Sequence, residues 1–159
     1  KEYGTPPEFP QFLRKLNSLM DDFYKDEVQM KEGAKEILQS LKKKNVKMCI
    51  ATATDRFLAE QCLSRLGILK DFAGVFTCGE AGAGKTQPYI YNQALAFLGT
   101  PKSDTWVFED ALYAVETASQ AGFNVVGVFD ADSDDDQEKI KELSDIYLKD
   151  YSKWGEYID

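Results

Sequence analysis

The fold of this protein is set by the stretch VKMCIATAT at residues 46–54, where a short apolar run ends in a pair of threonines. Residues 46–51 predict a buried strand, because the run is short and mainly apolar. A helix is predicted over residues 56–66, and Gly67 is expected to end it in the left-handed conformation. A strand that leads directly into a helix is the repeating unit of a parallel sheet.

The same alternation of strands and helices continues toward the carboxyl terminus. Gly99 and Gly122 follow two of the later helices, as Gly67 follows the first. The sequence therefore predicts an α/β fold: a three-layer α/β/α, Rossmann-like core with a parallel sheet and helices on both faces. The later strands are predicted at residues 74–78, 105–108, 124–129 and 146–148, and the helices between them at residues 89–98, 112–121 and 137–143.

Two amphipathic helices are predicted before the first strand. Apolar side chains recur at helical spacing from Phe12 to Phe23, after a loop at residues 4–10. The second helix is predicted over residues 32–43. The front of the chain is therefore expected to contain helices without strands.

Composition excludes several classes of protein. The chain has 159 residues, 43% of them apolar, which is enough for one buried core. Its formal net charge of −8 argues against a nucleic-acid partner, because binding to a duplex depends on clustered Lys and Arg. No apolar run approaches the roughly 18 residues of a membrane span. Residues 1–4, KEYG, also lack the apolar core of a signal peptide. We therefore expect neither a nucleic acid nor a membrane as partner.

The chain contains no histidine and an odd number of cysteines. Without histidine, Ser-His-Asp and Cys-His catalysis are both excluded, so acid–base chemistry falls to carboxylates or lysine. Cys49, Cys62 and Cys78 lie in or beside apolar runs and form no CxxC pair, which argues against a zinc site and a disulfide framework. We expect reduced thiols in a cytoplasmic protein.

Polar side chains follow three of the predicted strands. Thr52 and Thr54 close the first strand, Lys85 comes after the second, and Glu109 and Asp110 end the third. Because the carboxyl ends of parallel strands line one crevice, we expect these groups to converge on one ligand. Hydroxyls and free N–H groups there would bind an anion. Mg²⁺, which prefers oxygen ligands, would neutralise the adjacent carboxylates, so the sequence predicts a phosphate and metal site.

Each of these groups also has a purely structural interpretation. Threonines at the junction of a strand and a helix commonly cap the helix, which would account for Thr52 and Thr54. Asp110 would cap the next helix in the same way, with Glu109 paired to Lys85. Lys85 would alternatively extend into solvent from an inert glycine loop.

Two other motifs compete with this interpretation. GEAGAGKT at residues 79–86 matches G-x-x-x-x-G-K-S/T, the phosphate loop of nucleotide triphosphatases. Pro88 places the next helix about three residues too late for such a loop, but a P-loop nucleotide-binding protein remains the alternative. The acidic stretch at residues 130–136 suggests calcium, yet it lacks the Gly and Glu that an EF-hand loop requires. Ser133 as the N-cap of the following helix explains that stretch.

Four segments occur in a fixed order: MKEGAKEIL at residues 30–38, IATAT at 50–54, GKTQPYIY at 84–91 and VFED at 107–110. In this order and spacing they resemble the haloacid dehalogenase superfamily, in the branch of the β-phosphoglucomutases and phosphoglycolate phosphatases. The first segment is similar to the helix that follows the cap domain of that family, and the others to its second, third and fourth motifs. The resemblance covers residues 30–149.

The resemblance implies a Mg²⁺-dependent phosphatase or phosphomutase that acts on a small phosphorylated metabolite through an aspartyl-phosphate. A hydroxyl would hydrogen-bond the phosphoryl group, an ammonium would neutralise its charge, and carboxylates would bind the metal. Phosphoryl transfer depends on such positioning and charge neutralisation. The residues implied are Thr52 and Lys85 as catalytic groups, Thr54 and Arg56 as substrate contacts, and Asp110 and Glu109 as metal ligands.

The resemblance does not extend to the front of the chain. Members of the family begin with a strand that ends in DxDxT, whose first Asp attacks phosphorus, and residues 1–31 contain no such motif. That strand would lie between the strands before Thr52 and Glu109, and without it each unpaired buried backbone group costs roughly 1–3 kcal/mol. We therefore expect residues 1–30 to be the end of a helical cap domain and residues 31–159 an incomplete, inactive core. The alternative is a non-catalytic homologue that binds phosphate or a protein partner, and the sequence does not indicate the oligomeric state.

Overall fold

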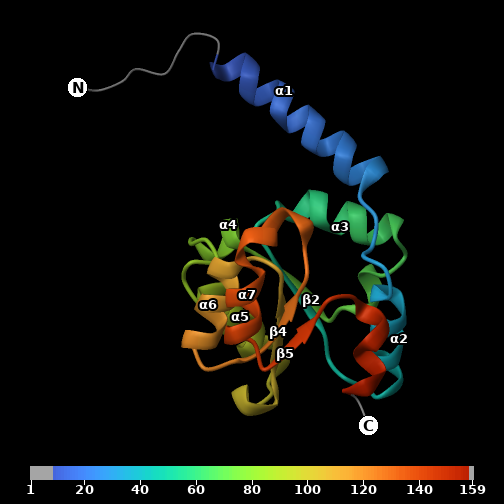
Figure 1. The fold of residues 1–159 in the computed structure, drawn as a ribbon. Helices are drawn as coiled ribbons and strands as arrows, with labels where there is room; N and C mark the ends of the chain where they lie inside the picture. Colours follow the sequence, from blue (N-terminus) through green and yellow to red (C-terminus); the bar gives the residue numbers. More distant parts are fainter. Residues whose placement is uncertain (1–8, 158–159) are drawn as a thin grey trace, which may run out of the picture.

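Strands and helices alternate through most of the molecule (Figure 1). The computed structural model describes residues 9–157. The predicted alternation is confirmed, with ends that differ by at most three residues, as is usual for helix and strand boundaries. The strands are β1 (Cys49–Thr52), β2 (Gly74–Thr77), β3 (Trp106–Glu109), β4 (Asn124–Val128) and β5 (Ile146–Leu148). The helices between them are α3 (Arg56–Arg65), α4 (Cys78–Ala81), α5 (Tyr89–Leu98), α6 (Leu112–Gln120) and α7 (Gln137–Leu143).

The strands form two parallel sheets and not the one sheet that the sequence predicts. β1 pairs with β2, and β3, β4 and β5 form a second sheet in that order. Among residues 9–157, β1 and β3 each pair on one side only. A strand edge without a partner leaves a row of N–H and C=O groups unpaired. The break falls at the position where the family resemblance places a further strand.

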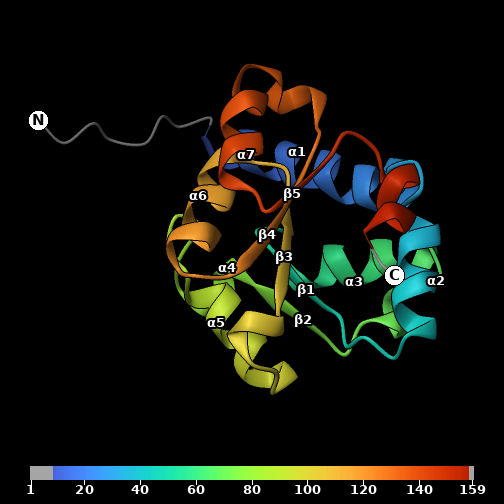
Figure 2. The same cartoon turned by 60° about the horizontal axis from the view of Figure 1, so that its bottom comes forward.

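Helices cover both faces of the larger sheet, which gives the three layers. Val125 and Val126 of β4 are both fully buried but belong to different hydrophobic clusters, because successive side chains of a strand point to opposite faces. The first cluster joins β4 to α5, α6 and α7, and Ala51 of β1 packs against it. The second joins β4 and β5 to α2 (Ala34–Lys43) and to the 3₁₀ segment η5 (Tyr151–Glu156). Figures 1 and 2 show these two groups of helices on opposite sides of the strands.

The predicted helix ends at glycine are confirmed. Gly67, Gly99 and Gly122 all have positive φ, at 74°, 67° and 78°. The acidic stretch is organised differently from the prediction, since Asp130 and not Ser133 provides the cap. The Asp130 carboxylate accepts a hydrogen bond from the backbone N–H of Asp132 at 2.9 Å and starts the 3₁₀ segment η4 (Ala131–Asp136). Ser133 has non-helical φ and ψ, −113° and 26°, at a kink within that segment, and α7 begins after Asp136, which makes no side-chain cap.

The front of the chain is helical, as predicted. α1 (Phe9–Asp22) continues into the π-helical segment η1 (Phe23–Glu27), and Figure 1 shows α1 extending away from the α/β core. α1 begins before the predicted start, because Pro10 is tolerated in the first turn of a helix. The rest of the predicted loop, residues 4–8, lies outside the described residues. The apolar stripe of α1 is exposed, with Phe12 at 61% and Leu19 at 57%.

Two further expectations concern cysteines and membranes. Cys49, Cys62 and Cys78 carry free thiols. Within residues 9–157, no helix is both long enough and apolar enough to cross a bilayer.

The packing of β4 against α7 leaves no space for a side chain at Gly127. A Cβ atom there would lie 2.8 Å from Cγ2 of Ile140 and would collide with the Ser144 hydroxyl. We expect Gly127→Ala to lower the free energy of unfolding by about 2 kcal/mol, measured by urea denaturation, because overpacking a tight core displaces backbone. The control is Gly79→Ala, whose added Cβ meets no atom within 4 Å. Equal losses in the two variants would contradict this account of the packing.

Candidate phosphate and metal site

A buried ion pair joins the loop after β2 to the end of β3. Lys85 lies between α4 and α5, and its Nζ atom is 2.6 Å from Oε1 of Glu109, the last residue of β3. The Lys85 side chain is 14% exposed and that of Glu109 only 7%. The pair therefore brings the carboxyl ends of the two sheets together, although the sheets share no backbone ladder.

A tyrosine hydroxyl supports the same carboxylate. Tyr91, on α5, is buried and donates a hydrogen bond to Oε1 of Glu109 at 2.9 Å. Burial raises the pKa of Glu109 above its ordinary value, and the ammonium of Lys85 and the hydroxyl of Tyr91 oppose that rise. Burial and the negative charge of Glu109 raise the pKa of Tyr91, so its hydroxyl stays protonated and keeps donating. The Lys85 ammonium and the Tyr91 hydroxyl both donate to Oε1 of Glu109. The carboxylate, itself held by Tyr91, therefore fixes the position of the Lys85 ammonium.

Asp110, the next residue, is in a different environment. Its side chain is 43% exposed, and its Oδ2 atom lies 3.6 Å from Nζ of Lys31. Ala111, and not Asp110, is the N-cap of α6, and no side chain caps that helix. The capping role that the sequence left open for Asp110 is therefore not observed, and its carboxylate faces solvent.

The threonine pair forms a hydrogen-bonded chain at the end of β1. The Thr52 hydroxyl accepts a hydrogen bond from the backbone N–H of Thr54 at 3.0 Å. The Thr54 hydroxyl is hydrogen-bonded to the hydroxyl of Tyr24, in η1, with the oxygens 2.8 Å apart. Neither threonine caps α3, whose N-cap is Asp55 without a side-chain hydrogen bond. Thr52 stands level with Thr77 at the carboxyl end of β2.

The guanidinium of Arg56 is hydrogen-bonded to other residues of the protein. It donates to both carboxylate oxygens of Glu80, at 2.6 and 2.7 Å. It also donates to Glu60 at 2.9 Å and to the carbonyl of Val75 at 2.7 Å. The hydrogen bonds from Arg56 lower the pKa of Glu80 to about 2. The predicted contact of Arg56 with substrate would require it to leave one of these partners.

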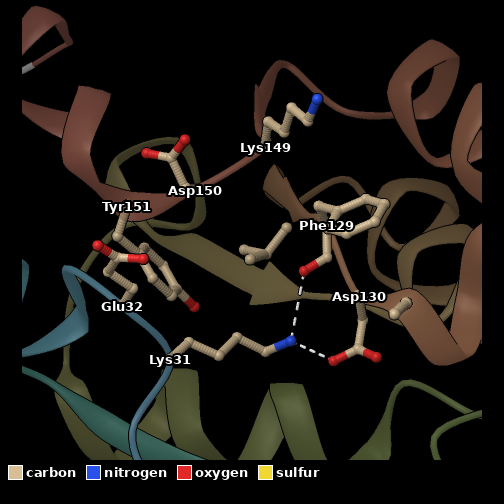
Figure 3. A pocket seen from close by; sticks show the side chains of 9 residues that line it. Lys31, Glu32, Phe129, Asp130, Lys149, Asp150 and Tyr151 are labelled. Atoms are coloured by element: carbon tan, nitrogen blue, oxygen red, sulfur yellow. Dashed lines mark hydrogen bonds and ion pairs between the residues drawn. The ribbon is translucent and has the colours of Figure 1, made fainter.

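A hollow beside Asp110 was not predicted from the sequence. Lys31 and Tyr151 line it together with Phe129 and Asp130, and Figure 3 shows the Lys31 side chain reaching across it. Burial raises the pKa of Tyr151 to about 12, and the charges of Asp110 and Glu109 add to that rise. These residues come from distant parts of the sequence. The sequence singled out the segment at residues 30–38, which contains Lys31, and the acidic stretch that begins at Asp130, but not their meeting.

The geometry does not form a P-loop. The short helix α4 (Cys78–Ala81) overlaps the first residues of the matching motif and has Thr77 as its cap. Lys85 lies ahead of α5, which begins at Tyr89, and its ammonium pairs with Glu109. In a P-loop the lysine belongs to the first turn of the helix. The motif at residues 79–86 is therefore a coincidental match.

The described residues fit a Mg²⁺ site that leaves most coordination positions to water and phosphate. Asp110 offers an open carboxylate at the end of β3, and that carboxylate already attracts a cation, the ammonium of Lys31. Within residues 9–157, no group of three or more His, Cys, Asp or Glu side chains could hold a metal ion by itself. Mg²⁺ is commonly bound by one or two carboxylates together with waters and substrate phosphates. The same result leaves the acidic stretch without a calcium site.

Comparison with known proteins assigns the family. A family model described as a haloacid dehalogenase-like hydrolase matches residues 8–122, more than half of the 159 residues. The chain belongs to the haloacid dehalogenase-like hydrolases. The matched residues of this haloacid dehalogenase-like chain include Thr52, Lys85 and Asp110.

Curated relatives of this haloacid dehalogenase-like chain are longer proteins. It is 32% identical over 122 residues to validoxylamine A 7'-phosphate phosphatase of Streptomyces hygroscopicus subsp. limoneus, covering 77% of this chain and 55% of that protein. It is 31% identical over 96 residues to the β-phosphoglucomutase of Bacillus subtilis (strain 168), covering 60% and 42%. The chain spans about half the length of these relatives. The crystal structure of β-phosphoglucomutase from Clostridium difficile has the same fold, with a TM-score of 0.73 at 19% identity over 99% of this chain and 71% of that one.

The Tyr91 hydroxyl is expected to stabilise ionised Glu109. We expect Tyr91→Phe to lower the free energy of unfolding by about 2 kcal/mol at neutral pH, because a hydrogen bond to a charged group is lost. The loss should shrink as the pH falls through the raised pKa of Glu109, since a protonated carboxyl gains less from the hydroxyl. Urea denaturation at several pH values measures both effects. Tyr89→Phe, on the exposed side of the same helix, is the control, and a loss at Tyr91 that is independent of pH would contradict the account.

Proposed function

We propose that this chain is the later part of a Mg²⁺-dependent phosphatase or phosphomutase that acts on a small phosphorylated metabolite. The observation that carries the proposal is the buried Lys85–Glu109 pair beside the open carboxylate of Asp110. In this proposal the loop between α4 and α5 supplies a cation for phosphate, and the segment after β3 supplies a ligand for metal. The names of two relatives, a validoxylamine A 7'-phosphate phosphatase and a β-phosphoglucomutase, support this chemistry.

The chain's own residues have distinct roles in this proposal. Lys85 neutralises the charge that develops on the phosphoryl oxygens, and Glu109 holds its ammonium in place. The Thr52 hydroxyl hydrogen-bonds the same group, with Thr54 beside it. Asp110 would hold Mg²⁺, which supplies further positive charge to the phosphate when bound. Arg56 contacts substrate only if it is released from Glu80.

The nucleophile is proposed to lie on a strand outside these residues. An aspartate at the end of that strand would form the aspartyl-phosphate, and the strand would pair with the free edges of β1 and β3. Those edges are unpaired among the described residues, which supports the proposal. This chain should not turn over phosphate esters by itself.

The domain assignment follows from the same proposal. Residues 1–30 would be the end of a helical cap domain and residues 31–159 the core. The exposed apolar stripe of α1, with Phe12 and Leu19, supports a missing partner in such a cap. The free thiols support a cytoplasmic location.

Phosphate binding tests the role of Lys85. We expect Lys85→Met to weaken the binding of inorganic phosphate in the presence of Mg²⁺ at least tenfold, measured by calorimetry, because charge-assisted contacts to the anion are lost. Lys85→Met with Glu109→Gln avoids leaving a buried carboxylate unpaired and should show the same weakening. Lys47→Met is the matched control, because Lys47 precedes β1 at the opposite end from Thr52 and contacts the carbonyl of Leu98. Equal phosphate affinity in the Lys85 and Lys47 variants would remove Lys85 from the site.

Turnover tests the enzyme against the non-catalytic homologue. With a preceding strand that ends in DxDxT, the protein should hydrolyse p-nitrophenyl phosphate in the presence of Mg²⁺. Asp110→Asn should lower kcat by about 10² because electrostatic stabilisation by the bound metal is lost. Phosphate binding by the longer protein without any turnover would favour the non-catalytic homologue.

A further inference from the structure

Lys31 places a protein cation against the carboxylate proposed to bind metal. Its Nζ atom donates to the Asp130 carboxylate and to the carbonyl of Phe129, the latter at 3.3 Å (Figure 3). The same atom lies 3.6 Å from Oδ2 of Asp110. The ammonium is therefore hydrogen-bonded on the Asp130 side and in ion-pair contact without a hydrogen bond on the Asp110 side.

The fold brings the two carboxylates to one cation. β3 and β4 are parallel neighbours, and Glu109 stands level with Gly127, so the segments that follow these strands emerge side by side. Asp110 follows β3 directly, and Asp130 follows β4 after one intervening residue. Lys31 comes from the segment between η1 and α2, which is 99 residues from Asp130 in the sequence.

The backbone fixes the segment that carries Lys31. Gly33, two residues later, has a φ of 76°, and a Cβ there would lie 2.9 Å from Cβ of Tyr151. The segment is thus packed against η5, and the Lys31 side chain extends from a fixed origin over the end of the sheet. The Asp130 side chain is also fixed, because its other carboxylate oxygen accepts the hydrogen bond that caps η4.

We infer that Lys31 is an internal competitor for the divalent cation at Asp110, and that Asp130 is the residue that draws Lys31 away when the cation binds. This inference rests on the proposed metal role of Asp110. The ammonium neutralises Asp110 in the absence of metal and repels an incoming cation. When a divalent cation binds Asp110, the ammonium of Lys31 remains hydrogen-bonded to Asp130 and to the carbonyl of Phe129. Lys31 and Asp130 thereby set the metal affinity of a site in which neither is a ligand.

Substitutions at Lys31 and Asp130 should change the affinity for a divalent cation in opposite directions. Removing the ammonium with Lys31→Met should tighten cation binding at least about fivefold, which is the effect of two unit charges about 4 Å apart even at the dielectric constant of bulk water. Asp130→Asn, which removes the carboxylate that holds Lys31, should weaken cation binding, because Asp110 is then the remaining ion-pair partner of Lys31 among the described residues. In the Lys31→Met background, Asp130→Asn should have no further effect, because Asp130 acts through Lys31.

Manganese binding by the chain as it exists provides the measurement. Mn²⁺ prefers the same oxygen ligands as Mg²⁺. Free Mn²⁺ is counted from its electron paramagnetic resonance signal, and Mg²⁺ is then added as a competitor. Lys149→Met is the matched control, because Lys149 lines the same hollow, and it should change the dissociation constant less than twofold. Thermal unfolding of each variant confirms that it is folded.

The outcomes separate the two proposals. Loss of Mn²⁺ binding in Asp110→Asn supports the metal role of Asp110, and unchanged binding overturns that role and the proposed function with it. If Asp110 is required, tighter binding in Lys31→Met and weaker binding in Asp130→Asn support the competitor. Unchanged or weaker binding in Lys31→Met overturns it. A persistent effect of Asp130→Asn in the Lys31→Met background would show that Asp130 acts on the cation directly, which also overturns the inference.

Discussion

The ion pair between Lys85 and Glu109 is the contact on which the geometry of the site depends. The two sheets share no backbone hydrogen bonds in the described part of the chain, so side chains must hold their carboxyl ends together. Lys85 reaches from the loop after β2 to the end of β3, and Tyr91 donates to the same carboxylate from α5. A buried carboxylate is costly unless it is paired and hydrogen-bonded, so each of the three groups depends on the other two.

Glu109 and Asp110 are adjacent in sequence but have opposite surroundings. Glu109 is the last residue of β3 and its side chain is 7% exposed, whereas Asp110 follows the strand and its side chain is 43% exposed. Glu109 is contacted by Lys85 and Tyr91, whereas Asp110 is exposed and lies 3.6 Å from the ammonium of Lys31. One carboxylate therefore serves as a fixed support for a cationic side chain, and the other remains open to a cation from solution.

The break between β1 and β3 shows what the hydrophobic core contributes without a continuous sheet. Ala51 of β1 and Val107 of β3 pack against the same cluster, which includes Val125 of β4 and residues of α5, α6 and α7. Non-directional apolar packing keeps the two sheets in one layer, whereas backbone pairing requires a strand between them.

Local sequence determined the order of strands and helices, the helix ends at Gly67, Gly99 and Gly122, and the placement of Thr52, Glu109 and Asp110 at strand ends. Hydrophobic periodicity and the freedom of glycine to take positive φ act over a few residues, so they can be recognised without a structure.

The pairing of Glu109 with Lys85 was one of the interpretations that the sequence left open, whereas tertiary structure alone decided the other partners of these side chains. Tyr91 meets Glu109 from 18 residues away, Tyr24 meets Thr54 from 30, and Lys31 meets Asp130 from 99. Tertiary structure also decided that the Arg56 guanidinium is hydrogen-bonded to Glu80 and that the strands form two separate sheets. Such contacts depend on how whole elements pack against one another, and no local pattern in the chain encodes that packing.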